Sequence, residues 1–240
     1  MSSSATARTS TTASSTSSAS NRVPEQIADS SVHPDVPNYP PSRDTPVEIV
    51  ACGALAGHIR EIAARRGWPV TVRPLPAALH NRPQNIGSHA ERMLATPEAT
   101  GSRAVLGYAD CGSYGALDKL AAKAGVGRLP GLHCYDLYAG AAAIERLFAE
   151  EPGTYLLTDY LIKSFERSVI QPLGLDRYPE LWPDYFGHYR RLVWLVQRST
   201  AELEEAATLI ASQFNLPLTR IDTGTQGLEA ALESLIDPEH

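Results

Sequence analysis

The sequence predicts an α/β protein with a mostly parallel, doubly wound (Rossmann-like) sheet flanked by helices. Two observations support this prediction. Short β-branched runs alternate with segments of helical periodicity from residue 47 to the end of the chain, and consecutive runs are separated by about one helix, which is the spacing of parallel strands joined by crossovers. No repeat at the periods typical of solenoids offers another architecture.

Seven segments have the composition of buried strands. They are short, rich in β-branched or other apolar residues, and bounded by glycine, proline or acidic residues. In chain order they span 47–53, 70–76, 103–112, 126–131, 154–160, 191–197 and 217–224. The pattern is weakest at 126–131, where two glycines and a proline interrupt the apolar residues.

The predicted helices have apolar residues at helical spacing and, in several cases, recognisable ends. Gly67 ends the first of them. Ser199 or Thr200 can cap the helix before the last strand, whose first turn is acidic. The helices span 54–67, 83–95, 116–125, 136–151, 199–214 and 227–236, and residues 161–190 are predicted to be helical or irregular.

The N-terminal part of the chain has a different composition. Residues 1–20 contain only Met, Ser, Thr, Ala and Arg, and residues 21–46 are rich in proline. Such segments cannot bury enough apolar surface to order themselves. The sequence therefore predicts a disordered tail over 1–46, followed by a single α/β domain over 47–240.

Composition and charge indicate in which compartment the protein works and which classes of partner it can bind. The formal net charge of the chain is −6, which argues against a nucleic-acid partner. No apolar run approaches the roughly 18 residues of a membrane span, so no membrane contact is expected. Three cysteines without a CxxC motif favour a reducing compartment, and we expect a cytoplasmic protein. The sequence leaves the oligomeric state open.

Side chains with sulfur or nitrogen ligand atoms follow several of the predicted strands. They are Cys52, His80, Cys111, His133 and Cys134. Because the carboxyl ends of parallel strands meet at one edge of a sheet, where ligands bind, we expect these side chains to lie close together. Three thiolates and an imidazole suit tetrahedral zinc, and three thiolates suit an iron–sulfur cluster with one open iron. The sequence therefore predicts a metal site holding zinc or an iron–sulfur cluster.

Metal-free chemistry with the same cysteines is the alternative. Cys111, His133 and Asp136 would make an activated thiol nucleophile of the hydrolase type. Cys52 and Cys111 facing each other would suit two-base proton transfer, and their placement resembles that in cofactor-independent amino-acid racemases, although the Asn-Thr that usually follows such cysteines is absent. A non-catalytic carrier of a metal or corrinoid is a third reading, so whether the chain is an enzyme stays open.

Five motifs occur in a fixed order: VACGAL, LHNRP, VLGYADCGSYGAL, LPGLHCYDLYAG and GTYLLTDYL. Together they resemble the uncharacterised family catalogued as domain of unknown function 1638, over roughly residues 47–225. The resemblance implies that the cysteines and histidines named above are the family's signature positions. The chain departs from the family pattern at His133 and Cys134, which are adjacent here, whereas an acid separates histidine from cysteine in the family.

The resemblance also implies a pathway. Members of the family often occur beside corrinoid-dependent methyltransferase systems, which suggests one-carbon or methyl-transfer metabolism. The expected partner is then a small-molecule substrate or a protein of a corrinoid system. A zinc-bound thiolate would suit a methyl acceptor, because zinc keeps a thiol deprotonated at neutral pH.

Overall fold

The computed structural model describes residues 45–98 and 101–237, all of which belong to the compact unit Tyr39–His240. The predicted disordered tail, residues 1–46, lies outside the described residues except for its last two positions. Six strands form two separate three-stranded sheets in the described part of the chain, and all strand pairs are parallel. The predicted α/β class with parallel, helix-flanked strands is confirmed.

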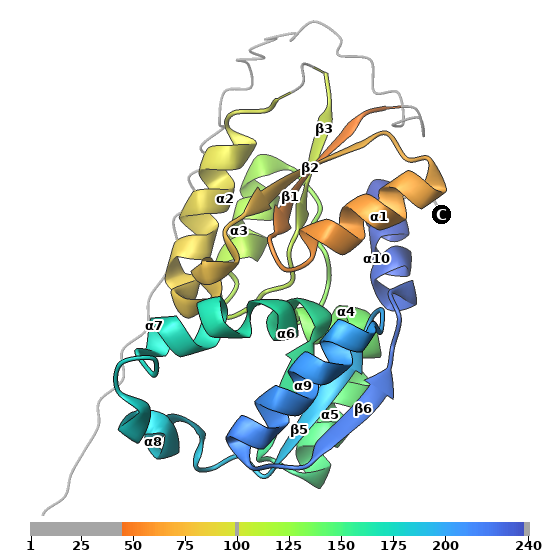
Figure 1. The fold of residues 1–240 in the computed structure, drawn as a ribbon. Coiled ribbons are helices and arrows are strands. Elements are labelled where there is room, and N and C mark those ends of the chain that lie inside the picture. The colour runs from red at the N-terminus through yellow and green to blue at the C-terminus, as the bar shows by residue number, and fades with distance from the viewer. Residues whose placement is uncertain (1–44, 99–100, 238–240) are drawn as a thin grey trace, which may run out of the picture. The chain divides into compact units, whose positions relative to one another are not determined.

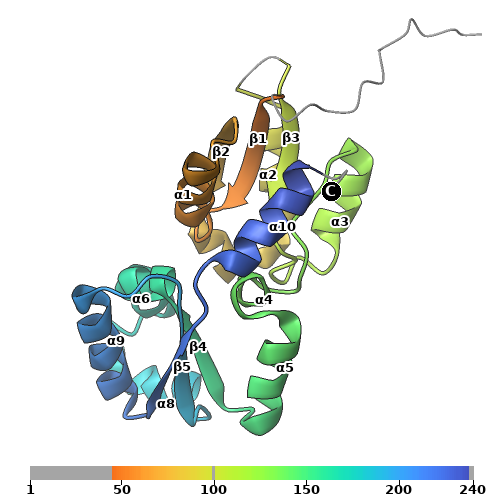
Figure 2. The ribbon, with the colours of Figure 1, turned by 90° about the vertical axis from the view of Figure 1, so that its right-hand side faces the viewer.

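The first sheet has the strand order β2-β1-β3. Its strands are β1 (Val47–Cys52), β2 (Val70–Leu75) and β3 (Arg103–Gly107). Helices α1 (Ala56–Arg66) and α10 (Gln226–Ile236) cover one face, and α2 (Ile86–Leu94) and α3 (Ala116–Ala124) cover the other (Figures 1 and 2). The C-terminal helix thus returns to the first sheet, where Leu228 and Leu232 are fully buried.

The second sheet has the order β4-β5-β6. Its strands are β4 (Thr154–Thr158), β5 (Arg191–Val196) and β6 (Leu218–Asp222). Alternate residues of β5 point to opposite faces. Val193 and Leu195 pack with Ile144 of α5 (Ala141–Glu150), whereas Trp194 packs with the core under α6 (Asp159–Phe165) and α9 (Ala201–Phe214).

Shorter elements connect these layers. After β2 come the 3₁₀ helices η1 (Ala77–Asn81) and η2 (Pro83–Asn85), and α4 (Cys134–Ala139) precedes α5. The connection from β4 to β5 continues α6 through a π-helical segment, η3 (Glu166–Ile170), and then runs through α7 (Gln171–Leu173), η4 (Pro179–Leu181) and α8 (Trp182–Phe186). The prediction of helical or irregular structure over 161–190 is therefore confirmed. No helix in 45–98 or 101–237 is long and apolar enough to cross a membrane.

Two predicted elements differ from the structure. Residues 126–131 do not form a strand: only one bridge joins Leu106 to Arg128, because the segment leaves the extended conformation at Gly131, whose φ is 93°. The helix predicted over 136–151 is two helices, α4 and α5. They are divided at Gly140, whose φ of 81° is left-handed and incompatible with a continuous α-helix.

The topology of the first sheet defines a position for a site. β1 is central, and the helices that follow β1 and β2 lie on opposite faces of the sheet. The chain order therefore reverses between β1 and β3. In parallel α/β sheets, ligands bind outside the carboxyl ends of the strands at such a reversal.

Candidate functional site

The three cysteines converge at the carboxyl ends of β1 and β3. Cys52 is the last residue of β1 and is fully buried. Cys111 lies in the turn after β3 and is also buried, whereas Cys134 begins α4 and keeps some exposed surface. The fold thus gathers thiols from three separate segments at the chain reversal.

Burial keeps these thiols protonated. It raises the pKa of Cys52, and it raises the pKa of Cys111 to about 12, with a further contribution from the neighbouring Cys52. Protein atoms enclose the Cys134 sulfur despite the exposed surface of the residue, and this burial raises its pKa well above the ordinary value. Cys111 and Cys52 each raise the pKa of Cys134 further, because ionised thiols repel one another.

Backbone N–H groups near the three sulfurs lower the pKa of the thiols. Those of Ala54 and Leu55 act on Cys52, although the Leu55 N–H donates to the Cys52 backbone oxygen at 2.9 Å, and that of Cys134 acts on Cys111 and on Cys134 itself. Hydrogen bonds to sulfur stabilise negative charge there and tune thiolate–metal centres. The local backbone therefore favours the ionised state that burial alone disfavours.

The turn that carries Cys111 is strained. Cys111 has a φ of 49°, in the left-handed region that residues other than glycine seldom adopt. Its N–H donates to the backbone oxygen of Leu132 at 2.7 Å. The Asp110 carboxylate accepts from the Ser113 hydroxyl at 2.8 Å and from the Gly115 N–H at 2.9 Å. Such strain, about 1–3 kcal/mol, persists where surrounding bonds enforce it, and here they hold Cys111 beside the start of α4.

Tyr108 connects the thiols with His80. Its ring stacks on the His80 imidazole, with centroids 6.0 Å apart and 21° between the planes. The side chain is fully buried, and its hydroxyl forms no well-oriented hydrogen bond with any described residue. The hydroxyl interacts with the Cys52 thiol, but sulfur is a weak acceptor, so the hydroxyl has no strong hydrogen-bond partner among the described residues.

His80 is a neutral imidazole with one ring nitrogen free to accept. Its Nδ1–H donates to the backbone oxygen of Ala77 at 3.1 Å, because a carbonyl oxygen can only accept. The proton is therefore on Nδ1, and Nε2 carries the lone pair that can accept a hydrogen bond or bind a metal. Burial lowers the pKa of His80, and the nearby His133 lowers it further.

His133 and Asp136 have a structural arrangement at the start of α4. The Asp136 carboxylate accepts from the N–H groups of Leu132 at 2.8 Å and His133 at 3.1 Å. The His133 side chain is exposed, and its ring centroid lies 6.3 Å from that of Tyr135. The Asp136 carboxylate therefore binds backbone N–H groups and not the His133 imidazole, which faces the Asp136 N–H instead, so the set Cys111, His133 and Asp136 lacks an acid that orients the base.

These side chains do not form a ready coordination shell. Across residues 45–98 and 101–237, no group of three or more His, Cys, Asp or Glu side chains is arranged to hold a metal ion. Cys52 and Cys111 belong to the hydrophobic core of the first sheet. His80 and Cys134, by contrast, line a common cavity.

That cavity has a volume of about 210 Å³ and lies beyond the carboxyl ends of β1, β2 and β4. The lining from the first sheet comes from the residues after β1 and β2 and from the start of α4. The lining from the second sheet comes from β4, α6 and η3, including Tyr155, Thr158 and Ser168. The sequence gives no signal for these last residues: Tyr155 and Thr158 lie in a predicted buried strand (154–160), and Ser168 lies in the connection 161–190, where no chemistry was expected.

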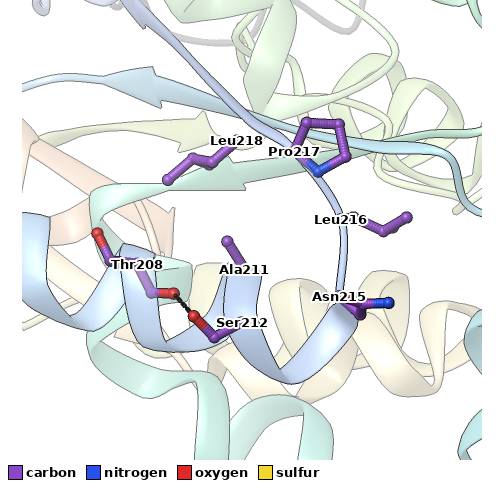
Figure 3. A pocket seen from close by; sticks show the side chains of 7 residues that line it. All are labelled: Thr208, Ala211, Ser212, Asn215, Leu216, Pro217 and Leu218. Atoms are coloured by element: carbon purple, nitrogen blue, oxygen red, sulfur yellow. Dashed lines mark hydrogen bonds between the residues drawn. The ribbon is translucent and has the colours of Figure 1, made fainter.

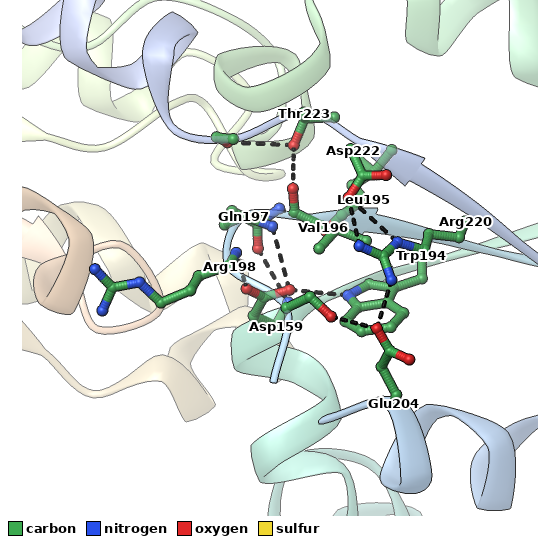
Figure 4. Close-up of polar contacts among 12 residues, drawn as sticks. Asp159, Trp194, Leu195, Val196, Gln197, Arg198, Glu204, Arg220, Asp222 and Thr223 are labelled. Atoms are coloured by element: carbon green, nitrogen blue, oxygen red, sulfur yellow. Dashed lines mark hydrogen bonds and ion pairs between the residues drawn. The ribbon is translucent and has the colours of Figure 1, made fainter. Parts of the chain in front are cut away.

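Asp159 marks the equivalent edge of the second sheet but is fully engaged in structural bonds. Its carboxylate is buried and accepts from Trp194 Nε1 at 2.9 Å and from the Arg198 N–H at 2.6 Å (Figure 4). The Gln197 N–H donates to it at 3.3 Å, and the Gln197 side-chain oxygen accepts from the Asp159 N–H at 3.0 Å. These bonds join the ends of β4 and β5.

A larger depression, of about 560 Å³, lies where α9 ends and β6 begins (Figure 3). It is lined by Thr208, Ala211, Ser212, Asn215, Leu216, Pro217 and Leu218. None of these side chains is an acid, a base or a thiol. The depression also lies at the amino end of a parallel strand, opposite the edge where ligands bind. The smaller cavity beside Cys134 is therefore the better candidate site.

Comparison with known proteins identifies a family. The family described as "Protein of unknown function (DUF1638)" matches residues 74–232, a stretch that includes His80, Cys111 and Cys134 and begins after Cys52. No curated protein and no solved structure matches the chain. Because the matched stretch covers more than half of the 240 residues, the chain belongs to the DUF1638 family of proteins of unknown function.

Proposed function

We propose that the protein binds a thiophilic metal ion, zinc in the first instance, through Cys52, Cys111 and Cys134, with His80 as the fourth ligand. One observation carries the proposal: three thiols from separate segments converge at the chain reversal between β1 and β3. Soft thiolates and an imidazole are the ligands that zinc prefers in proteins.

The surroundings of the thiols support this function. Backbone N–H groups near the sulfurs lower the pKa of the thiols, and a strained turn holds Cys111 against the start of α4. The Tyr108 hydroxyl adds a polar group without a strong hydrogen-bond partner to an otherwise apolar core. Packing alone requires none of these features, whereas a thiolate–metal centre uses hydrogen bonds of this kind from its surroundings.

A metal-free thiol enzyme fits the site less well. The thiolate is the reactive form of cysteine, and catalytic cysteines have a lowered pKa. Burial instead raises the pKa of Cys52 and Cys111, so both thiols are protonated at neutral pH in the metal-free protein. The acid and base that would activate Cys111 are also not paired, since Asp136 binds backbone N–H groups.

Binding would require the ligand side chains to rotate. The described residues contain no preformed group of three ligands, so the thiols would have to turn toward a common point as they lose their protons to the metal. A cysteine sulfur moves by rotation about a single side-chain bond. We therefore expect a saturable site whose affinity decreases with falling pH.

The test is a zinc titration of reduced, chelator-treated full-length protein by calorimetry. We expect one zinc ion per chain in the wild type and a loss of at least tenfold in affinity in Cys111→Ser, because oxygen replaces thiolate poorly at a soft metal. Cobalt substitution should give the thiolate-to-cobalt charge-transfer absorption of a tetrahedral site. Protein purified without oxygen should be colourless.

A matched pair of histidine variants locates the fourth ligand. His80 and His89 each bond a backbone oxygen of their own helix through Nδ1, at 3.1 and 2.9 Å, but only His80 lines the cavity. His80→Asn should weaken zinc binding, and His89→Asn should leave it unchanged. Zinc binding that survives Cys111→Ser, or a wild type that binds no zinc, would overturn the proposal. A brown chromophore that disappears when the cysteines are replaced would show that the site holds an iron–sulfur cluster instead of zinc.

A further inference from the structure

The cavity beside Cys134 has an uncharged lining. Its lining residues are Ala54, Ala77, Ala78, His80, Asn81, Cys134, Tyr135, Tyr155, Thr158, Tyr160, Leu161, Ser168 and Val169. None is an acid, a lysine or an arginine. A charged ligand would therefore lose its hydration without gaining a counter-charge.

Ser168 offers an unused hydroxyl to this cavity. It belongs to the π-helical segment η3, where the wider turn alters the usual hydrogen bonding. The preceding serine, Ser164, donates to the backbone oxygen of Tyr160 at 2.8 Å, as helical serines commonly do. No described residue forms a hydrogen bond with the Ser168 hydroxyl. Single π-helical turns are frequent at functional sites.

The size of the cavity and its aromatic lining indicate what it can hold. An apolar cavity of about 150 Å³ is large enough for benzene, and this one measures about 210 Å³. Tyr135, Tyr155 and Tyr160 contribute aromatic rings to its lining, together with the imidazole of His80. Aromatic side chains favour flat ligands through stacked or edge-to-face contacts.

We infer that the cavity binds a small, uncharged molecule about as large as one substituted aromatic ring, with a polar group that bonds to the Ser168 hydroxyl. The cavity adjoins the proposed metal centre, but binding of this molecule does not require the metal. A protein that binds such a molecule and no zinc would overturn the proposed function alone. A protein that binds zinc and no such molecule would overturn this inference alone.

Benzamide and benzoate provide an isosteric pair of probes that differ in charge. We expect saturation-transfer NMR to show benzamide binding to the full-length protein at millimolar concentration and no binding of benzoate. Ser168→Leu, which fills the cavity, should abolish the benzamide signal. Ser168→Ala, which removes only the hydroxyl, should weaken binding by about three- to tenfold, the effect of one neutral hydrogen bond.

Ser212→Leu is the matched control. Ser212 is an exposed helical serine that lines the depression at the other edge and donates to the backbone oxygen of Thr208 at 2.9 Å. This variant should bind benzamide as the wild type does. Equal binding of benzoate would overturn the requirement for an uncharged ligand. Unchanged binding in Ser168→Leu, or no binding of benzamide by the wild type, would overturn the inference.

Discussion

Tyr108 is the residue at which core packing and the proposed site meet. Its ring fills the core of the first sheet and stacks on His80, while its hydroxyl interacts with the Cys52 thiol. A phenylalanine would fill the same space without burying a polar atom. The unpartnered hydroxyl therefore costs stability in the metal-free protein, and a role at the site would account for its presence.

Replacing Tyr108 by phenylalanine should stabilise the metal-free protein by up to about 1 kcal/mol, because the variant no longer buries an unpartnered hydroxyl. Tyr138→Phe is the matched control. The Tyr138 hydroxyl is hydrogen-bonded to His58 Nδ1 at 2.8 Å, so its removal should destabilise the protein by about 1 kcal/mol. Urea denaturation of both variants measures the effects. Equal destabilisation in the two variants would show that the Tyr108 hydroxyl has a good partner.

The positions of the cysteines could be predicted from the sequence, whereas the position of Ser168 could not. Cys52 and Cys111 were predictable because each follows a strand pattern, and strand ends meet at one edge. The left-handed backbone of Cys111 was not predictable, since it depends on a bond to Leu132 from a distant segment. Ser168 gave no signal, because a π-helical turn has no distinctive sequence pattern and its position against the cavity depends on how the elements pack.

At the scale of elements, the two wrong predictions, the strand over 126–131 and the single helix over 136–151, fall where the apolar pattern continues but the backbone changes conformation. The apolar residues around 126–131 suggested a strand, and Leu106 does exchange backbone bonds with Gly127 and Leu129. The ladder ends there because Gly131, with a φ of 93°, leaves the extended conformation. Gly140 interrupts a strong helical pattern in the same way, through its left-handed conformation. Apolar periodicity predicts which face of an element is buried, but not where its backbone turns.

Asp159 stabilises the ends of two strands through bonds that need a carboxylate. Both of its oxygens accept backbone or indole N–H groups in a buried setting. Asp159→Asn would place an amide donor against those donors, and we expect a loss of about 1–3 kcal/mol in unfolding free energy. Asp222→Asn, which alters an exposed ion pair with Arg220, should cost less than about 1 kcal/mol. Similar losses in chemical denaturation of the two variants would contradict the structural role of Asp159.

At the scale of the molecule, alternation predicted parallel strands and a shared carboxyl edge but not the division into two sheets. Each strand pattern indicates burial on both faces, and this holds equally for one sheet or for two. The long connection between β4 and β5 does not reveal which strands pair, because pairing is decided by packing among distant segments. The cavity lining depends on that packing, since it combines residues following β1 and β2 with residues of β4, α6 and η3.

His58 should make the stability of the whole molecule depend on pH. It lies on α1 and contacts Tyr138 of α4, and the charged groups that act on it are Glu61, Asp159, Lys163 and Arg198. Burial lowers its pKa in the folded protein, and the two acids only partly oppose this effect. The unfolded state therefore binds a proton more tightly than the folded state does.

The sign of the pH effect follows from that difference. The contribution of His58 to stability is complete above its unfolded pKa of about 6.5 and is lost as the pH falls below that value. His58→Gln cannot take up the proton, so its unfolding free energy should decrease less than that of the wild type between about pH 7.5 and pH 5.5. Tyr138→Phe, which leaves the imidazole in place, should keep a pH dependence like that of the wild type. Urea denaturation at several pH values measures these slopes, and a slope in His58→Gln as steep as in the wild type would show that another group controls the acid sensitivity.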